Sequence, residues 1–110
     1  MYLAITGGRA YAYPEIVWAT LDEYDKTNLF LVLGDANGVD TQAKSWAERY
    51  KVPHKVHRAD WETFGKAAGP LRNGEMIKEA DALLAFPGGR GTENCTNQAI
   101  QKGIPVRRVT

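Results

Sequence analysis

The chain has 110 residues, 44% of them hydrophobic and 25% charged, which fits one globular domain and excludes a disordered protein. Its 14 basic and 13 acidic residues nearly cancel, so it lacks the basic excess that drives non-specific nucleic-acid binding. The single cysteine excludes an internal disulfide and indicates a reducing compartment, and no apolar run approaches the roughly 18 to 20 residues of a membrane span. We therefore expect one cytoplasmic domain over residues 1–110 that does not associate with membranes.

Short apolar runs alternate along the chain with segments of helical periodicity. In chain order, the predicted elements are a strand at 2–6, a helix from Pro14 to about Asp25, a strand at 29–33, a helix at 41–50, a strand at 54–58, a loop with a helical turn at 60–70, a helix at 71–80, a strand at 82–86, a helix from Thr92 to about Lys102 and a strand at 104–109. Pro14 suits the first turn of a helix, and Gly103 suits the position that follows a helix end.

This alternation predicts an α/β fold with one Rossmann-like, three-layer domain. Single helices between consecutive strands imply right-handed crossovers and a mainly parallel sheet covered on both faces. We expect five strands in the order 3-2-1-4-5. In such a doubly wound sheet, ligands bind outside the carboxyl ends of the strands where the strand order reverses. The expected cleft therefore lies between the ends of the first and fourth strands.

Glycine-rich turns follow the first, second and fourth predicted strands, so all three lie at this edge of the sheet. The segments are Gly7-Gly8-Arg9, the turn 34–40 that begins at Gly34, and Pro87-Gly88-Gly89-Arg90-Gly91-Thr92. Glycines let a ligand approach the backbone closely, and the amino end of a helix attracts anions. The third segment, called the glycine loop below, is therefore predicted to bind a phosphate.

The same residues resemble the SLOG superfamily of Rossmann-like nucleotide-processing and nucleotide-sensing domains, and within it the small YspA-type (cpYpsA-related) branch found in bacteria and phages. The segments that carry the resemblance are Gly7-Gly8-Arg9, Gly34-Asp35-Ala36-Asn37-Gly38-Val39-Asp40, Trp46-Ala47, Ala59-Asp60-Trp61, 65–70, Arg72-Asn73, Met76, Ala80-Asp81 and the glycine loop. Domains of this superfamily are related to the LOG (lysine-decarboxylase-like) phosphoribohydrolases.

The resemblance implies roles for individual residues. In the LOG enzymes the glycine loop and its threonine hold the phosphate of a nucleoside monophosphate, which implies that role here for Gly88, Gly89, Gly91 and Thr92. An arginine on the preceding helix, here Arg72, contacts the sugar-phosphate and assists loss of the base. The catalytic glutamate of those enzymes would stand at Cys95, so this chain departs from their pattern. Arg72 and Glu93, the nearest acid, are the candidate catalytic residues.

Other candidates for ligand contact are Arg9, Asp40, Asp60, Lys66, Asn73 and Arg90. Asp40 either caps the helix that begins near Thr41 or contacts a ribose hydroxyl. Asp60 and Trp61 either pack within their loop or contact a ribose or base, and Lys66 is either solvated or bound to a phosphate.

For several other residues the sequence predicts a structural role and not a ligand contact. Cys95 is expected to be a small buried group and not a nucleophile, because no histidine is near it in the sequence. His54 and His57 lack the neighbouring ligands of a metal site, and we expect no metal and no cofactor. Trp18 and Trp46 are expected to be core or dimer contacts.

The sequence therefore predicts a protein that binds a nucleotide-derived small molecule, such as a nucleoside phosphate, an ADP-ribose-like compound or a cyclic signalling nucleotide, for sensing, sequestration or processing. One alternative is a phosphoribohydrolase or transferase that cleaves the N-glycosidic bond of nucleoside 5′-monophosphates. Another is single-strand nucleic-acid binding, against which the near-neutral charge argues. A homo-oligomer, with a dimer as the first expectation, is predicted as well.

Overall fold

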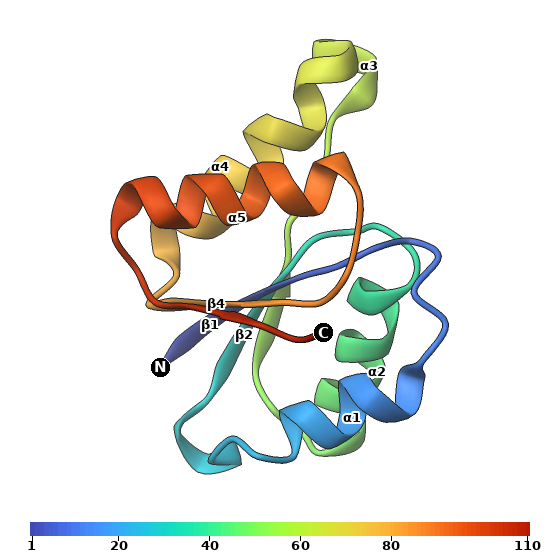
Figure 1. Cartoon of the computed structure of the whole chain (residues 1–110), viewed down its shortest axis with the longest axis vertical. Coiled ribbons are helices and arrows are strands. Elements are labelled where there is room, and N and C mark those ends of the chain that lie inside the picture. Colours follow the sequence, from blue (N-terminus) through green and yellow to red (C-terminus); the bar gives the residue numbers. More distant parts are fainter.

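The computed structural model describes all residues, 1–110, and contains a central sheet of five parallel strands (Figure 1). The strands are β1 (Tyr2–Thr6), β2 (Phe30–Leu33), β3 (His54–Val56), β4 (Ala82–Ala85) and β5 (Val106–Arg108). Their order in the sheet is β3-β2-β1-β4-β5, and every neighbouring pair is parallel. The predicted Rossmann-like fold and the predicted strand order 3-2-1-4-5 are confirmed.

Two helices cover each face of the sheet (Figure 1). The helices α1 (Pro14–Leu21) and α2 (Val39–Arg49) pack on one face, and α4 (Ala68–Glu79) and α5 (Arg90–Lys102) pack on the other. A short helix α3 (Trp61–Phe64) and the 3-10 turn η2 (Gly65–Ala67) precede α4 and project beyond the sheet, and another 3-10 turn, η1 (Lys26–Asn28), precedes β2. None of the helices is long and apolar enough to cross a membrane.

The central strands are buried on both faces because their side chains are apolar without alternation. Odd-numbered residues of β1, such as Leu3 and Ile5, belong to the core under α1 and α2, whereas Ala4 belongs to the smaller core under α4 and α5. Trp46 is fully buried in the larger core, and its indole N–H donates to Asp22 Oδ1 at 2.9 Å. Trp46, predicted to be a core or a dimer contact, is therefore a core residue.

Several helix boundaries differ from the prediction. The first helix ends at Leu21 and not near Asp25, because Asp25 instead caps the turn η1 through the Thr27 amide. The helix predicted from Leu71 begins at Ala68, since Pro70 lies in its first turn, where no backbone donor is needed. The helix α5 begins at Arg90, two residues before the predicted start at Thr92.

The end of α4 is held by a lysine from α5. The ammonium group of Lys102 donates to the carbonyl oxygens of Ile77, Lys78 and Ala80, at 2.7, 3.0 and 3.0 Å. The Ile77 oxygen also accepts from the Ala80 amide at 3.2 Å. The ammonium group adds a charged donor to the carbonyl oxygens at the end of α4 and complements the negative end of the helix dipole. As predicted, Gly103 ends α5, in the left-handed conformation with a φ of 85°.

Candidate functional site

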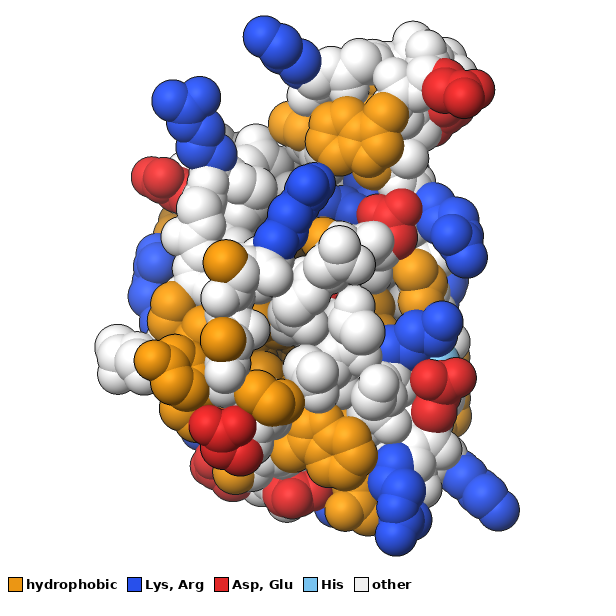
Figure 2. Space-filling view, turned by 90° about the vertical axis from the view of Figure 1, so that its right-hand side faces the viewer, with side chains coloured by type: hydrophobic (Ala, Val, Ile, Leu, Met, Phe, Trp, Pro, Cys, Tyr) orange, Lys and Arg blue, Asp and Glu red, His pale blue; other side chains and the backbone are white.

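A cavity of about 920 Å³ opens at the edge of the sheet where the strands have their carboxyl ends. Figure 2 looks onto this edge, where several basic side chains lie close to hydrophobic ones in the upper half of the view. The cavity is bordered by the turns that follow β1, β2 and β4, by the segment from α3 to α4, and by the first turns of α5.

Most of the predicted site residues border this cavity. They are Gly7, Gly8, Arg9, Gly34, Asp40, Lys66, Arg72, Asn73, Pro87, Gly88, Gly89, Arg90, Gly91 and Thr92. Asp60 and Glu93 do not border it. The side chains that do include four basic groups (Arg9, Lys66, Arg72 and Arg90) and one carboxylate, that of Asp40. The lining is therefore positively charged.

The glycine loop packs directly against the turn that follows β1. The amide of Gly8 donates to the carbonyl oxygen of Pro87 at 2.9 Å, and a Cβ on Gly88 would lie 2.7 Å from the Gly8 nitrogen and collide with the Thr92 hydroxyl. Only glycine therefore fits at position 88. A Cβ on Gly89 or Gly91, in contrast, would meet no atom within 4 Å.

The first turn of α5 faces the cavity with unpaired backbone donors. Gly89 is the cap residue, and Arg90 begins the helix, so the amides of residues 90–92 have no acceptor within the helix. Arg90 and Thr92 themselves border the cavity. Free amides, the positive end of a helix dipole and an arginine together form an arrangement that binds anions.

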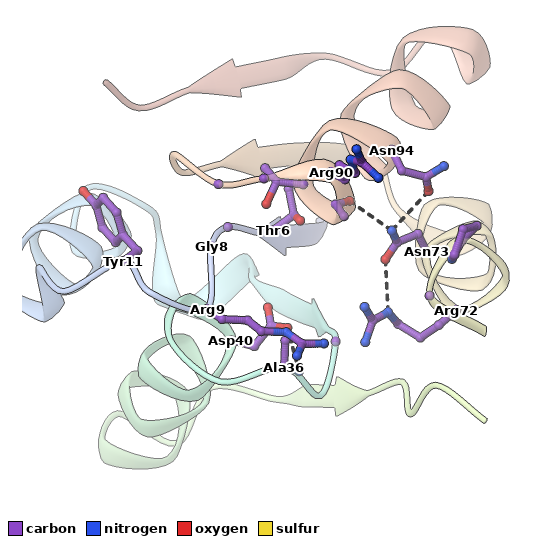
Figure 3. A pocket seen from close by; sticks show the side chains of 18 of the residues that line it. Thr6, Gly8, Arg9, Tyr11, Ala36, Asp40, Arg72, Asn73, Arg90 and Asn94 are labelled. Carbon is purple, nitrogen blue, oxygen red and sulfur yellow. Dashed lines mark hydrogen bonds between the residues drawn. The ribbon is translucent and has the colours of Figure 1, made fainter. Parts of the chain in front are cut away.

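Arg72 is fixed at the cavity by a network of hydrogen bonds (Figure 3). Its Nη1 lies 2.6 Å from Asp35 Oδ1, and its Nε donates to Asn73 Oδ1 at 3.0 Å. The amide of Asn73 in turn donates to the Gly91 carbonyl oxygen and to Asn94 Oδ1, both at 3.2 Å. The network joins the turn after β2 to α4 and α5. In Figure 3 the Arg72 side chain and that of Arg9 reach into the same space from opposite sides.

Asp40 provides the carboxylate of the cavity. It is 7% exposed, and its Oδ2 accepts from the Ala36 amide at 3.1 Å. Burial raises the pKa of this carboxyl group to about 6, against the opposing effects of the Ala36 hydrogen bond and the charge of Arg72. Oδ1 makes no hydrogen bond within the chain. Because no buried side-chain oxygen lacks a partner, Oδ1 is accessible to solvent, and Asp40 borders the cavity.

Of the two alternatives predicted for Asp40, the helix cap is wrong. The helix α2 begins at Val39, two residues before the predicted start, and Gly38 is its cap residue. Gly38 has a φ of 79°, and a Cβ there would lie 2.6 Å from the Arg9 carbonyl oxygen, so this tight turn requires glycine. Asp40 consequently lies inside the first helical turn, and its carboxylate reaches back to Ala36.

Asp60 and Glu93 do not border the cavity, although each is next in sequence to a residue that does. Asp60 is exposed and caps α3 by accepting from the Thr63 amide at 3.1 Å. Glu93 is exposed in the first turn of α5. The neighbour of Asp60, Trp61, borders the cavity in its place.

Cys95, at the position where the resemblance to the LOG enzymes implies a glutamate, is completely buried. Burial raises the pKa of its thiol to about 11, although the Thr6 hydroxyl and the charge of Arg72 act in the opposite direction. As expected, the residue is a small core group.

Neither histidine borders the cavity, and each contacts another group of the chain. His57 Nε2 lies 2.8 Å from Glu79 Oε1, and His54 Nδ1 lies 3.0 Å from the Val52 carbonyl oxygen. No three His, Cys, Asp or Glu side chains are grouped in a way that could hold a metal ion.

Several side chains of the cavity wall were not predicted from the sequence as site residues, among them Thr6, Tyr11, Met76 and Asn94. Tyr11 follows the predicted turn 7–9 by two residues and packs against Phe86. Asn94 lies one helical turn after Arg90 on α5, but the helix predicted from Thr92 did not include Arg90, so this spacing gave no signal.

Comparisons with known proteins agree with this architecture. The chain is 45% identical to the Gene 61 protein of Mycobacterium phage D29, over 93% of this chain and 90% of that protein. Its fold matches the X-ray structure of TM1055, a structural genomics target, with a TM-score of 0.80 at 16% identity, over 96% of this chain and 71% of that one. A family model, described as the YspA, cpYpsA-related SLOG family, matches residues 1–64. The chain belongs to this SLOG family, as its sequence predicted.

Proposed function

We propose that the cavity binds a nucleotide-derived small molecule and holds its phosphate at the glycine loop. One observation carries this proposal: the free amides at the start of α5, the glycine loop and three arginines (Arg9, Arg72 and Arg90) border one cavity. Arginine forms strong, directional hydrogen bonds with phosphate oxygens, and helix amino ends favour the same group. Membership of the SLOG family supports a nucleotide-related role in general.

The size of the cavity supports a ligand larger than inorganic phosphate. Its volume of about 920 Å³ lies in the range of small-molecule and cofactor sites, roughly 300 to 1,000 Å³. Thr6, Asp40 and Asn94 add polar groups that can accept or donate hydrogen bonds along a sugar. The cavity therefore suits a nucleoside phosphate, an ADP-ribose-like compound or a cyclic nucleotide.

Isothermal titration calorimetry with AMP, ADP-ribose and 3′,5′-cyclic AMP tests this proposal. We expect binding of at least one of them, and a loss of roughly tenfold or more in affinity for Arg90→Ala, because each charge-assisted hydrogen bond contributes about 1.5 to 3 kcal/mol. Arg49→Ala is the matched control, since Arg49 lies in the last turn of α2 and does not border the cavity. Absence of binding to all three compounds at millimolar concentration contradicts the proposal.

A second candidate function is hydrolysis of the N-glycosidic bond of a nucleoside monophosphate, and the open Oδ1 of Asp40 favours it. A carboxylate beside the sugar could accept a proton from water as the water attacks C1′ and the base leaves with the bonding electrons. Glu93 and Asp60 lie outside the cavity wall, which leaves Asp40 as the carboxylate positioned for this step.

Release of free base from AMP, measured by chromatography, tests this second candidate. We expect Asp40→Asn to bind AMP and release no base, and Arg72→Ala to lose activity as well. An unchanged rate in Asp40→Asn contradicts the role of Asp40, and absence of base release by the native protein contradicts the hydrolysis itself.

We also propose that the protein acts in the cytoplasm as a homo-oligomer, most simply a dimer. Trp18 is half-buried on α1 and packs edge-on against Tyr50, whose side chain is 39% exposed after α2. Exposed aromatic groups of this kind are common at interfaces between identical subunits. Light scattering coupled to gel filtration measures the mass, and a monomer at micromolar concentration contradicts this part of the proposal.

A further inference from the structure

Trp61 is a large apolar side chain that remains exposed at the wall of the cavity. It lies on the four-residue helix α3 and is 49% exposed. Seven other large hydrophobic side chains are exposed to a similar degree: Met1, Tyr2, Tyr13, Tyr50, Phe64, Leu71 and Ile100. None of these seven borders the cavity. Trp61 therefore offers an uncovered aromatic surface inside the candidate site.

The indole of Trp61 rests on the backbone of α4 at a position that lacks a side chain. A Cβ on Gly69 would lie 3.3 Å from Cη2 and 3.9 Å from Cζ2 of the indole, so glycine at this position leaves room for the ring. Asp60 caps α3, the helix that carries Trp61, by accepting from the Thr63 amide. The ring therefore packs on α4 while about half of the Trp61 surface stays exposed.

Hydrogen-bonding groups surround the open part of the ring. Trp61 also borders a second, smaller hollow of about 140 Å³, which shares Arg9 and Arg72 with the main cavity and adds Asp35 and Asn37. The Asn37 amide makes no hydrogen bond within the chain and is exposed. A flat apolar surface beside free polar groups matches a heterocyclic base, which has an aromatic face and a hydrogen-bonding edge.

We infer that Trp61 stacks on the heterocyclic base of the ligand, at the opposite end from the phosphate on the glycine loop. This inference rests on the proposed function and adds the residue that recognises the base. Base–aromatic stacking tolerates every base, because each base has an aromatic face. Trp61 therefore raises the affinity for nucleoside phosphates over sugar phosphates, and Asn37 and Arg9 can contribute to the choice of base.

A comparison of nucleoside monophosphates with ribose 5-phosphate tests the stacking, because ribose 5-phosphate has the same sugar and phosphate but no base. Calorimetry is performed with AMP, GMP, CMP, UMP and ribose 5-phosphate on the native protein and on Trp61→Leu. We expect Trp61→Leu to weaken binding of the best nucleotide by roughly 5- to 100-fold, the range typical of one stacked base, and to leave ribose 5-phosphate within about twofold.

Phe64→Leu is the matched control. Phe64 lies on the same short helix and is 52% exposed, but it does not border the cavity, so its replacement is expected to leave all five affinities unchanged. Fluorescence provides a second readout: the best nucleotide quenches the native emission, and the quenching disappears in Trp61→Phe, because neither Trp18 nor Trp46 borders the cavity.

The outcomes separate this inference from the proposed function. If the native protein binds ribose 5-phosphate as tightly as every nucleotide, or if Trp61→Leu weakens both classes alike, the stacking is wrong while phosphate binding stands. If Trp61→Leu changes only the mass of the particle in solution, Trp61 is a subunit contact, and the inference is wrong as well. If the native protein binds none of the five compounds, this inference fails, whereas the proposed function fails only if ADP-ribose and 3′,5′-cyclic AMP do not bind either.

Discussion

The guanidinium of Arg72 lies 2.6 Å from the carboxylate of Asp35, and Gly34, the residue before Asp35, leaves the space that the guanidinium occupies. A Cβ on Gly34 would lie 2.9 Å from Arg72 Nη1 and 2.8 Å from Asp40 Oδ2. Neither group can move away freely, because Arg72 is bonded to Asp35 and Asp40 is bonded to Ala36. The absence of a side chain at Gly34 thus permits the buried carboxylate of Asp40 and the guanidinium of Arg72 to lie next to each other.

We therefore expect Gly34→Ala to lower the free energy of unfolding by about 1 to 3 kcal/mol, the usual cost of overpacking, and to displace Arg72 from the cavity. Gly89→Ala is the control, because its Cβ would meet no atom within 4 Å and its φ of −98° suits alanine. Urea denaturation of both variants measures the difference. Equal stabilities for the two variants would show that the contacts at Gly34 are not restrictive.

Asp40 predicts a specific dependence of stability on pH. Its pKa rises from 3.8 in the unfolded chain to about 6 in the folded one, so between these values the folded protein binds more protons than the unfolded chain. Its contribution to stability is therefore fully present below about pH 4, declines as the pH rises to about 6, and stays constant above that. The asparagine side chain in Asp40→Asn does not titrate, so the stability of this variant lacks the decline due to Asp40.

The measurement is the difference in the free energy of unfolding between Asp40→Asn and the native protein at several pH values. We expect the difference to shift in favour of the variant by up to about 3 kcal/mol between pH 4 and pH 7, since one pKa unit corresponds to about 1.4 kcal/mol. A difference that does not change with pH would contradict the raised pKa of Asp40.

The ammonium group of Lys102 is expected to stabilise the end of α4. Lys102→Met keeps most of the aliphatic stem but removes the donor from three carbonyl oxygens, and we expect a loss of about 1 to 2 kcal/mol. Lys44→Met, on the exposed surface of α2, is expected to change stability by less than about 0.5 kcal/mol. A loss of similar size in both variants would assign the effect to general surface charge.

Cys95 is expected to be inert in the folded protein. It is completely buried, and its thiol has a pKa of about 11, so the reactive thiolate is scarce and inaccessible at pH 8. Ellman's reagent should therefore label the thiol only as fast as the protein unfolds, and at once in guanidinium chloride. Rapid labelling of the folded protein at pH 8 would contradict this burial.

The sequence predicted the strand order and the sheet edge that carries the site, because the runs 2–6, 29–33 and 82–86 lack polar alternation and each ends in a glycine turn. Helix starts were less predictable. Tertiary contacts decide them: Gly38 adopts a positive φ against the turn after β1, so α2 begins earlier than its apolar periodicity indicates.

The direction of individual side chains could not be predicted at all in the short helix α3. In a four-residue helix the apolar periodicity is too brief to identify the inner face, and the sequence alone favoured neither Asp60 nor Trp61. Because the Trp61 indole packs on Gly69 of α4, Trp61 borders the cavity, whereas Asp60 caps α3. Tyr11 and Asn94 were missed because neither residue type marks a ligand site by itself.

The walls of the cavity come from both halves of the chain, and the halves contribute different chemistry. Residues 1–64, the part that the family model matches, include Arg9, Asp40 and Trp61, whereas Arg72 and the glycine loop follow later. A ligand bound in the cavity therefore contacts segments that are remote in sequence. Only the folded chain brings these segments together, so the ligand binds the folded state and not the unfolded one. Occupancy should raise the melting temperature in proportion to the logarithm of ligand concentration, so the protein itself can report its natural ligand in a label-free thermal screen of metabolites.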